Sequence, residues 1–591
     1  MTTAAEFRIA LAVLVIGCAF KLLNVFLLRF DSDEPQHLHV VWAWTQGLVQ
    51  YRDLFDNHMP LFQLACAPIL GLLGEHAAVL YWMRLLMIPL YVVALCCVYR
   101  IGQITFSRNV GVWAALLVSA ISAYHFCSTE FRTDNAWTVL WLLGLVVITR
   151  RPFELRSLMV AGLLLGLAFG VSMKTTLMLT TIVSAFGIAV ALVGWRRLHL
   201  SAARLGAGAA IFSVCMAVVP LIIFAFFAAQ GIWSQFVHCV FTHNLEPPTT
   251  KIYLKPLMFV FGAPTVIYIT RQLVRNEANP VVAFRRAFVC LTCGMYFFLM
   301  QGFWRHLTRE DYLALFPLLG LVIVALLGKA SDFLERRGIM PPLLRTVQLP
   351  AVVTSLVLVL DLGLRLPLTN EAAKEINRVR DVLAVTRRSD LVFDCKGEAV
   401  FRNRSVRYVL ESITSGRVER GEMPDDFETQ PPQSRARVAV IGGELSEYAE
   451  EFIEHNYLPV GHGIMVAGYA LPGASSPETP HHFHVAMADR YQVVTGNGDS
   501  VPGLLDGTTA NGARFLDVGE HTFVSDMTGV PLAILWAQAV ERHFTNFLTA
   551  PAPRPVYRPT PVREGGRRIV DMADDVPDPF FRPITFLSGA P

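Results

Sequence analysis

The sequence predicts a polytopic α-helical membrane protein with about eleven transmembrane helices and a C-terminal soluble region of α/β and β-sandwich type. Of the 591 residues, 53% are hydrophobic and only 16% are charged, whereas soluble chains carry about a quarter charged residues. The long apolar runs all lie before residue 367, and the remainder has ordinary polarity. A net charge of +3 without a Lys/Arg run argues against a nucleic acid as partner.

Eleven apolar runs approach the roughly 20 residues with which a helix crosses a bilayer, where only helices or closed barrels satisfy the backbone. They lie at 9–28, 77–99, 110–126, 135–149, 157–173, 175–194, 206–229, 257–270, 286–302, 311–328 and 347–366. The run 61–73 is too short to span, so we expect it to be interfacial or re-entrant. The first run lacks a small-residue cleavage site and is interpreted as a retained span.

Basic residues collect in alternate loops. One set of loops carries arginine and lysine clusters within 100–108, 150–156, 196–204, 271–286 and 329–345. The other loops carry fewer bases and most of the acids. Because cytoplasmic loops are enriched in Lys and Arg, the first set is predicted to face the cytoplasm. An odd number of spans then places the N-terminus in the cytoplasm and the region after residue 366 outside.

The polar region is predicted to contain two small domains after a transmembrane domain of residues 1–366. An α/β domain over 367–472 is expected to have helices at 371–386 and 446–456 and strands at 391–393, 437–441 and 464–470. A β-rich domain over 473–550 is expected to have strands at 482–488, 490–495, 513–517 and 521–525 and a terminal helix at 531–548. The Pro- and Arg-rich residues 551–591 are expected to be extended or partly disordered.

Acidic residues cluster in two of the expected outer loops. Asp31, Asp33 and Glu34 follow the first span directly, and Glu130 and Asp134 belong to a second short loop. A single loop carboxylate is usually only solvated. The clustering instead favours a reaction cleft, in which desolvation is expected to raise the pKa of Asp33 and Glu34 and suit them to accept a proton near neutral pH.

Two stretches carry a resemblance to a known family. These are residues 31–61, DSDEPQHLHVVWAWTQGLVQYRDLFDNHMPL, and residues 128–134, STEFRTD. Together with the long run of helices, they resemble the membrane glycosyltransferases of the GT-C superfamily over roughly residues 5–330. The nearest likeness is to bacterial relatives of the dolichyl-phosphate-mannose protein mannosyltransferases and of the lipid A aminoarabinose transferases. The Asp-Glu pair after the first span is the most specific part of the match.

The resemblance implies a GT-C-like catalytic domain in a bacterial inner membrane, with the C-terminal region on the periplasmic or extracellular side. It implies inverting transfer of a sugar from a polyprenyl-phosphate donor to a hydroxyl of a glycan, lipid or protein acceptor. Asp33 matches the position of the base, Glu34 is the neighbouring candidate, and Asp134 matches an acid that orients acceptor or base. His58 stands where some relatives carry Lys before Pro, and is expected to contact the leaving phosphate.

A departing lipid phosphate gains negative charge, so cations on the outer side are expected to stabilise it. The candidates beside His58 are Arg132, Lys174, Arg305 and Arg309. Lys174 lies between two closely spaced apolar runs, where it either has an acidic partner or snorkels from a helix end. The candidates for an acceptor-binding or lid surface are Tyr51, Asp53 and His243.

No motif requires a metal or another cofactor. HExxH and paired CxxC sequences are absent, and His238 and His243 lack a helical ligand spacing. The acidic loops could still attract a weakly bound divalent cation. Lys21, inside the first span, is expected to form an ion pair that packs helices together.

Two other classes of protein share parts of this pattern. A secondary transporter is also polytopic with intramembrane charges, but usually has repeated halves and broken helices at matching positions, which the sequence does not show. A non-catalytic envelope-assembly protein with a carbohydrate-binding outer domain is the other alternative.

Overall fold

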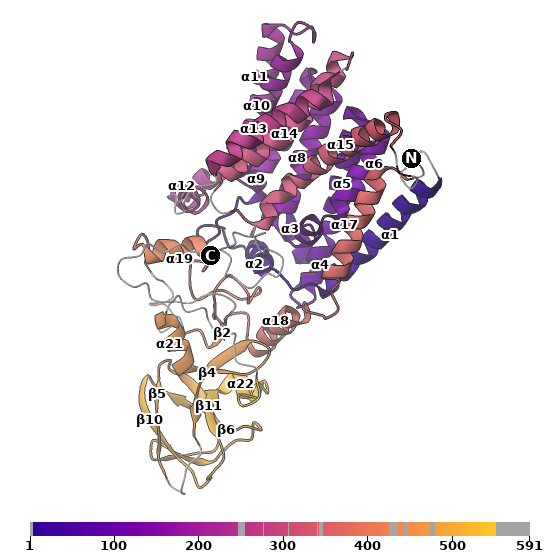
Figure 1. The fold of residues 1–591 in the computed structure, drawn as a ribbon. Coiled ribbons are helices and arrows are strands. Elements are labelled where there is room, and N and C mark those ends of the chain that lie inside the picture. Colours follow the sequence, from indigo (N-terminus) through magenta and orange to yellow (C-terminus); the bar gives the residue numbers. More distant parts are fainter. Residues whose placement is uncertain are drawn as a thin grey trace, which may run out of the picture.

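The computed structural model describes residues 4–245, 255–275, 277–304, 307–339, 341, 347–424, 435–441, 447–472 and 479–550. A bundle of long helices forms one end of the molecule, and a domain containing the strands forms the other (Figure 1). The shorter helices α2 (Asp33–Thr45) and α3 (Leu61–Leu73) lie between these two parts (Figure 1). The predicted tail 551–591 lies outside the described residues.

A helix occupies each of the eleven predicted apolar runs. The bundle contains α1 (Ala4–Leu27), α4 (Val79–Leu85), α5 (Met87–Thr105), α6 (Arg108–Ala120), α8 (Thr133–Arg150), α9 (Leu155–Val171), α10 (Thr175–Val193), α11 (Ala202–Ala229), α13 (Lys255–Val274), α14 (Pro280–Phe303), α15 (Phe316–Arg336) and α17 (Leu349–Arg365). By length and composition, seven of the described helical segments can cross a membrane, with α4 and α5 counted as one. The other four, α6, α8, α9 and α17, have 13 to 18 residues and are not among these seven. The protein is therefore a multi-pass membrane protein.

Glycines bring two of the bundle helices close together. A Cβ atom at Gly162 of α9 would lie 2.4 Å from the carbonyl oxygen of Phe212, and one at Gly166 would lie 2.5 Å from that of Met216, both in α11. This small-xxx-small spacing allows backbones to approach, which is a main source of helix association where lipid removes the hydrophobic driving force. The close approach holds α9 in place, and the segment after α9 carries Lys174.

The first outer segment differs from its prediction as a loop, because it contains α2. Gln36, His37 and His39 of α2 are as buried as its apolar residues, since neighbouring elements cover the helix on all sides. A helix buried all round has no amphipathic period, and its sequence therefore does not read as a surface helix. The 13-residue α3 occupies the short segment predicted not to span.

The region after the bundle contains α18 (Ala373–Val385), α19 (Ser412–Glu419), α21 (Glu447–Asn456), α22 (Ala537–Glu541), β1 (Val392–Asp394), β2 (Val438–Val440), β3 (Tyr457–Pro459), β4 (Ile464–Leu471), β5 (His481–Val485), β6 (Asp489–Thr495), β7 (Gly503–Leu505), β8 (Thr508–Ala510), β9 (Arg514–Leu516), β10 (Gly519–Val524) and β11 (Leu532–Trp536). A seven-stranded sheet has the order β1-β2-β4-β11-β6-β9, with β3 paired to β4, and a four-stranded sheet has the order β5-β10-β7-β8. β1 and β2 are parallel, and the other strand pairs are antiparallel.

Two predictions for this region are wrong. The boundary expected at residue 472 is crossed by the larger sheet, because β4 pairs with β11, and one buried core joins both predicted domains. The segment 532–536, predicted as part of a helix over 531–548, is the central strand β11, and only the short α22 follows it. All five residues of β11 are buried. A short apolar run that is buried on both faces has no period that separates a strand from a helix.

The sheet domain is docked on the first outer segment. The Arg407 guanidinium donates hydrogen bonds to the carbonyl oxygens of Tyr51 and Arg52, at 2.7 and 2.9 Å. His39 of α2 donates from Nδ1 to the Val400 carbonyl oxygen at 2.8 Å. These bonds join the two parts of the chain next to the residues that follow α1, where the acidic cluster lies.

Candidate functional site

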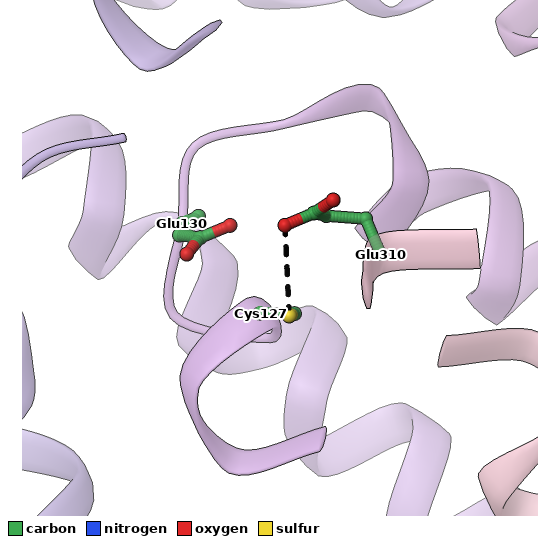
Figure 2. A group of neighbouring side chains, drawn as sticks. All are labelled: Cys127, Glu130 and Glu310. Atoms are coloured by element: carbon green, nitrogen blue, oxygen red, sulfur yellow. Dashed lines mark hydrogen bonds between the residues drawn. The ribbon is translucent and has the colours of Figure 1, made fainter. Parts of the chain in front are cut away.

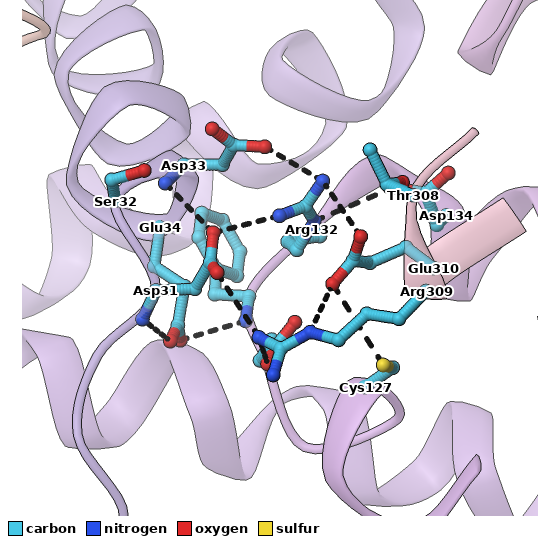
Figure 3. A network of polar contacts seen from close by, with 12 residues as sticks. Asp31, Ser32, Asp33, Glu34, Cys127, Arg132, Asp134, Thr308, Arg309 and Glu310 are labelled. Carbon is cyan, nitrogen blue, oxygen red and sulfur yellow. Dashed lines mark hydrogen bonds and ion pairs between the residues drawn. The ribbon is translucent and has the colours of Figure 1, made fainter. Parts of the chain in front are cut away.

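The acids after α1 meet the second acidic loop at Arg132, the residue that precedes α8 (Figure 3). Its guanidinium lies 2.7 Å from Asp31 Oδ1 and 2.6 Å from Asp33 Oδ2, and 3.5 Å from Asp134 Oδ2. Asp31 also accepts the backbone N–H of Asp33, the first residue of α2, at 3.1 Å. One arginine therefore gathers the two predicted acidic loops into a single cluster.

A second arginine enters the same cluster from the 3-10 helix η2 (Arg309–Ala314). Arg309 contacts Glu130 Oε1 at 2.7 Å, Glu310 Oε1 at 2.6 Å and Asp31 Oδ2 at 3.1 Å. A capping box between Thr308 and Asp311 fixes the start of η2, so that consecutive residues point in defined directions. These contacts place Arg309 beside both acidic loops, and its role at the donor phosphate stays a prediction.

Lys174 has two acidic partners, so the snorkelling alternative is wrong. Its ammonium lies 3.2 Å from Asp134 Oδ1 and 2.5 Å from Asp311 Oδ1, and the side chain is 20% exposed. The two carboxylates raise the pKa of Lys174 above its ordinary value, against the opposing effect of burial. Lys174 is therefore a charged member of the cluster.

The sheet domain supplies a further cation. Lys396, in the segment between β1 and the region docked on α2, contacts Asp33 Oδ1 and lies 3.2 Å from Ser32 Oγ. Lys396 was not a candidate from the sequence, because it is 363 residues from Asp33 and no local pattern marks it. The cluster thus draws on α2, the loop before α8, the segment before α10, η2 and the sheet domain.

The charge balance around Asp33 overturns one expectation. Burial would raise the pKa of Asp33, but Arg132 and then Lys396 hold that pKa well below its ordinary value. The predicted rise is therefore wrong for Asp33, because the sequence does not reveal both cations. Glu130 behaves differently: burial raises its pKa well above the ordinary value, although Arg309 opposes the rise.

Glu34 faces away from this cluster. Its carboxylate forms two hydrogen bonds with Arg84 of α4, at 2.6 and 2.8 Å, and both side chains are fully buried. It also accepts the backbone N–H of Phe131 at 2.9 Å and that of Asp31 at 3.0 Å. Arg84 was not among the residues predicted from the sequence, although an arginine inside an apolar run indicates a buried charge that needs a partner. Glu34 is placed to hold the fold rather than to meet a substrate.

His58 lies beside the cluster and is 26% exposed. Asp56 contacts His58 Nδ1 at 2.8 Å, and the His37 ring packs against the His58 ring. Burial would lower the pKa of His58, but Asp56 raises it above its ordinary value. His58 therefore carries positive charge over a wider pH range than a free histidine.

The three predicted acceptor or lid residues do not lie on one shared surface. Tyr51 and His243 are fully buried and do not form an exposed surface: the Tyr51 ring packs against Phe227 and Phe236, and His243 lies beside Glu411. Asp53 is partly exposed and lines a cavity of about 350 Å³. The other lining residues are His39, Ala43, Leu48, Leu54, Asn403, Arg404, Ser405, Val406 and Arg407. The candidate Arg305 lies outside the described residues.

Lys21 does not form the expected ion pair among the described residues. Its ammonium donates to the His125 carbonyl oxygen and to Ser128 Oγ, both at 2.7 Å. It also lies over the Tyr91 ring, 4.4 Å from the centroid. The prediction is wrong in its partner but right in its role, because these contacts tie α1 to the segment before α8.

One group of described side chains has the composition of a metal site. Cys127, Glu130 and Glu310 place one ligand atom each within 4.8 Å of one another (Figure 2). Arg309 contacts one oxygen of each carboxylate, at 2.7 and 2.6 Å. A guanidinium already supplies positive charge to these oxygens and would repel a divalent cation, so the group fits a metal poorly.

Comparisons with known proteins give the context of this cluster. Residues 57–224 match the family model described as dolichyl-phosphate-mannose-protein mannosyltransferase. No match was found among curated protein sequences.

Solved structures of ArnT share the fold. ArnT from Cupriavidus metallidurans in the apo state is 11% identical, with a TM-score of 0.52, over 79% of this chain and 98% of that chain. The same protein bound to undecaprenyl phosphate is 12% identical with the same TM-score and coverage. The oligosaccharyltransferase of Archaeoglobus fulgidus, tethered with an acceptor peptide, is 10% identical with a TM-score of 0.45, over 88% of this chain and 76% of that chain. A mannosyltransferase family model thus matches residues 57–224, and the chain shares the fold of ArnT.

Proposed function

We propose that this protein transfers a sugar from a polyprenyl-phosphate donor to an acceptor hydroxyl, with inversion, on the outer face of a bacterial inner membrane. The observation that carries the proposal is the group of cations, Arg132, Lys174 and Arg309, around the acids of the two outer loops. ArnT, which shares the fold, has been crystallised bound to undecaprenyl phosphate. A lipid phosphate is the class of ligand that such a group of cations suits.

The position of the cluster agrees with a reaction at one membrane surface. α8 starts at the cluster and ends at Arg150, whose carbonyl oxygen accepts a hydrogen bond from Arg285 at 2.8 Å. Its 18 residues span roughly 27 Å, close to the thickness of the hydrocarbon core. The arginine-rich loops and the acidic cluster therefore lie at opposite ends of the helix, which supports an outer location for the cluster.

In this mechanism, Asp33 accepts the proton of the acceptor hydroxyl while the hydroxyl oxygen attacks the anomeric carbon. The bond between that carbon and the phosphate oxygen breaks, and its electron pair leaves with the lipid phosphate. Arg132, Lys174 and Arg309, with His58, stabilise the developing charge. Asp134 holds both Arg132 and Lys174, which supports an orienting role. The side chains supply the positive charge, so the mechanism requires no metal or other cofactor.

The cavity beside Asp53 is the proposed acceptor side of the reaction. His39 on its wall follows Asp33 by six residues in α2, which corresponds to roughly 9 Å along the helix. The lining combines hydroxyl, amide and charged groups with aliphatic surface. This combination suits a polar acceptor such as a glycan, whose hydroxyl would meet Asp33 at the end of the helix.

The test is a comparison of cells that carry wild-type protein, Asp33→Asn or a control variant, Asp332→Asn. Asp332 is exposed at the distal end of α15. Mass analysis of glycolipids, glycans and glycoproteins should show one modification that is lost in Asp33→Asn and retained in Asp332→Asn. An unchanged modification in Asp33→Asn, with equal protein levels in the membrane, would refute Asp33 as the base.

A further inference from the structure

The segment that carries Lys396 is built to hold this side chain against Asp33. Asp394 accepts the backbone N–H of Gly397 at 3.0 Å and that of Ala399 at 3.1 Å, and Arg404 in turn donates to the Asp394 carboxylate. These bonds close a tight loop around Lys396. The ammonium is thereby positioned by backbone geometry rather than by a flexible linker.

The same loop is fitted to α2 by a glycine. Gly397 has a φ of +101°, a conformation that side chains disfavour, and a Cβ atom there would lie 3.1 Å from the Cβ of His39. Lys396 contacts Asp33 before Gly397, and Val400 accepts a hydrogen bond from His39 after it, so the loop and α2 are joined on both sides of Gly397. The sheet domain therefore delivers its lysine to the start of α2 with defined geometry.

Lys396 and Asp33 lie at the open rim of the cluster. Their side chains are 15% and 18% exposed, whereas those of Glu310 and Asp134 are 4% exposed. An ammonium has three N–H donors, and the described contacts of Lys396 engage two acceptors, Asp33 and Ser32. The third donor can therefore reach a ligand that approaches the rim.

Both oxygens of Asp33 are already paired in this state. Lys396 contacts Oδ1 and Arg132 contacts Oδ2. A carboxylate held between two cations is a weak proton acceptor. A catalytic base in this position needs a competing anion that draws a cation away.

We propose that Lys396 binds the phosphate of the lipid donor and, as it turns toward that phosphate, releases Asp33 to act as the base. This inference rests on the proposed function and adds two points to it: the C-terminal domain contributes a residue to the donor site, and the donor binds before the acceptor. The ligand class is a lipid-linked phosphate ester, for which lysine is a common partner.

The transfer step balances with Lys396 in this role. The acceptor oxygen forms a bond to the anomeric carbon, and its proton passes to the Asp33 carboxylate. The bond from the anomeric carbon to the phosphate oxygen breaks, and the electron pair remains on the lipid phosphate. Lys396 stabilises that product charge and returns to Asp33 after the lipid phosphate leaves and Asp33 loses its proton to water.

The test measures binding of undecaprenyl phosphate to the purified full chain in detergent micelles. The variants are Lys396→Met, Lys396→Arg and the matched control Lys374→Met, which removes an exposed lysine of α18 in the same domain. Lys396→Met is expected to weaken binding by about 10- to 100-fold, the range for one hydrogen bond to a charged group. Lys396→Arg should stay within about threefold of wild type, because it keeps the charge, and Lys374→Met should not change the affinity.

A second readout separates this role from a structural one. Removing Lys396 raises the pKa of Asp33, so the acidic limb of the rate profile should move to higher pH in Lys396→Met and remain in place in Lys396→Arg. In Lys396→Met, the KM for the donor should rise by a larger factor than the factor by which kcat, measured with the donor in excess, falls.

The outcomes distinguish the two proposals. If wild-type protein does not bind undecaprenyl phosphate, the proposed donor class fails. Size exclusion and thermal unfolding check that Lys396→Met is folded. If wild type and the folded Lys396→Met variant bind undecaprenyl phosphate equally well, only the role of Lys396 is refuted.

Discussion

The substitution Arg84→Met should destabilise the protein by removing one partner of a fully buried ion pair. The Arg84 guanidinium contacts both oxygens of Glu34, and both side chains are 0% exposed. It also donates to the carbonyl oxygens of Leu28 and Arg29 after α1, each at 2.7 Å. Leaving a buried carboxylate without its partner costs about 3–5 kcal/mol. The expected loss is at the upper end, because two carbonyl oxygens also lose their donors.

The assay is thermal unfolding of the purified chain in detergent, followed by tryptophan fluorescence. Glu34→Gln combined with Arg84→Met removes both charges and is expected to recover much of the lost stability. Glu34→Gln alone should also unfold earlier, whereas Asp33→Asn should lose transfer without a comparable loss of stability. An Arg84→Met variant that unfolds at the wild-type midpoint, or a double variant no more stable than Arg84→Met, would refute the reasoning.

Three further predictions concern other parts of the molecule. Lys174→Met should lower both the donor affinity and the stability, because it leaves the buried Asp311 without its cation. Lys174→Arg should restore much of both. If Lys174→Met binds undecaprenyl phosphate as tightly as wild type, this prediction is wrong. Gly166→Val should lower the unfolding midpoint by separating α9 from α11, whereas Gly187→Val, which has no atom within 4 Å of its Cβ position, should not; equal midpoints argue against the close approach. Burial raises the pKa of Glu398 from 4.5 to about 7, so the folded protein binds the proton more tightly, and stability should fall as pH rises through this interval. In Glu398→Gln, the unfolding midpoint should lose this dependence on pH between pH 4.5 and 7.5. An unchanged pH dependence refutes the assignment.

Most helices of the bundle could be predicted from the sequence, because lipid requires each span to satisfy its own backbone and thus leaves a local apolar signal. The run 206–229 shows this directly, since it lies within one continuous helix, α11. The strand β11 could not be predicted in the same way. Its apolar run is too short to carry a period, and its identity depends on pairing with β4 and β6, which lie far from it in the chain.

The candidate site divides along the same line. The sequence by itself determined that Asp33, Arg132 and Asp134 stand beside spans and that Lys174 and Arg309 are unusual charges there, because charge is scarce in a membrane domain. Only the tertiary structure decided which acid faces which cation. In the folded chain, Glu34 pairs with Arg84, Lys174 pairs with Asp311, and Lys396 of the sheet domain pairs with Asp33. Those pairings join residues from separate elements, and they depend on packing between distant segments that no local spacing records.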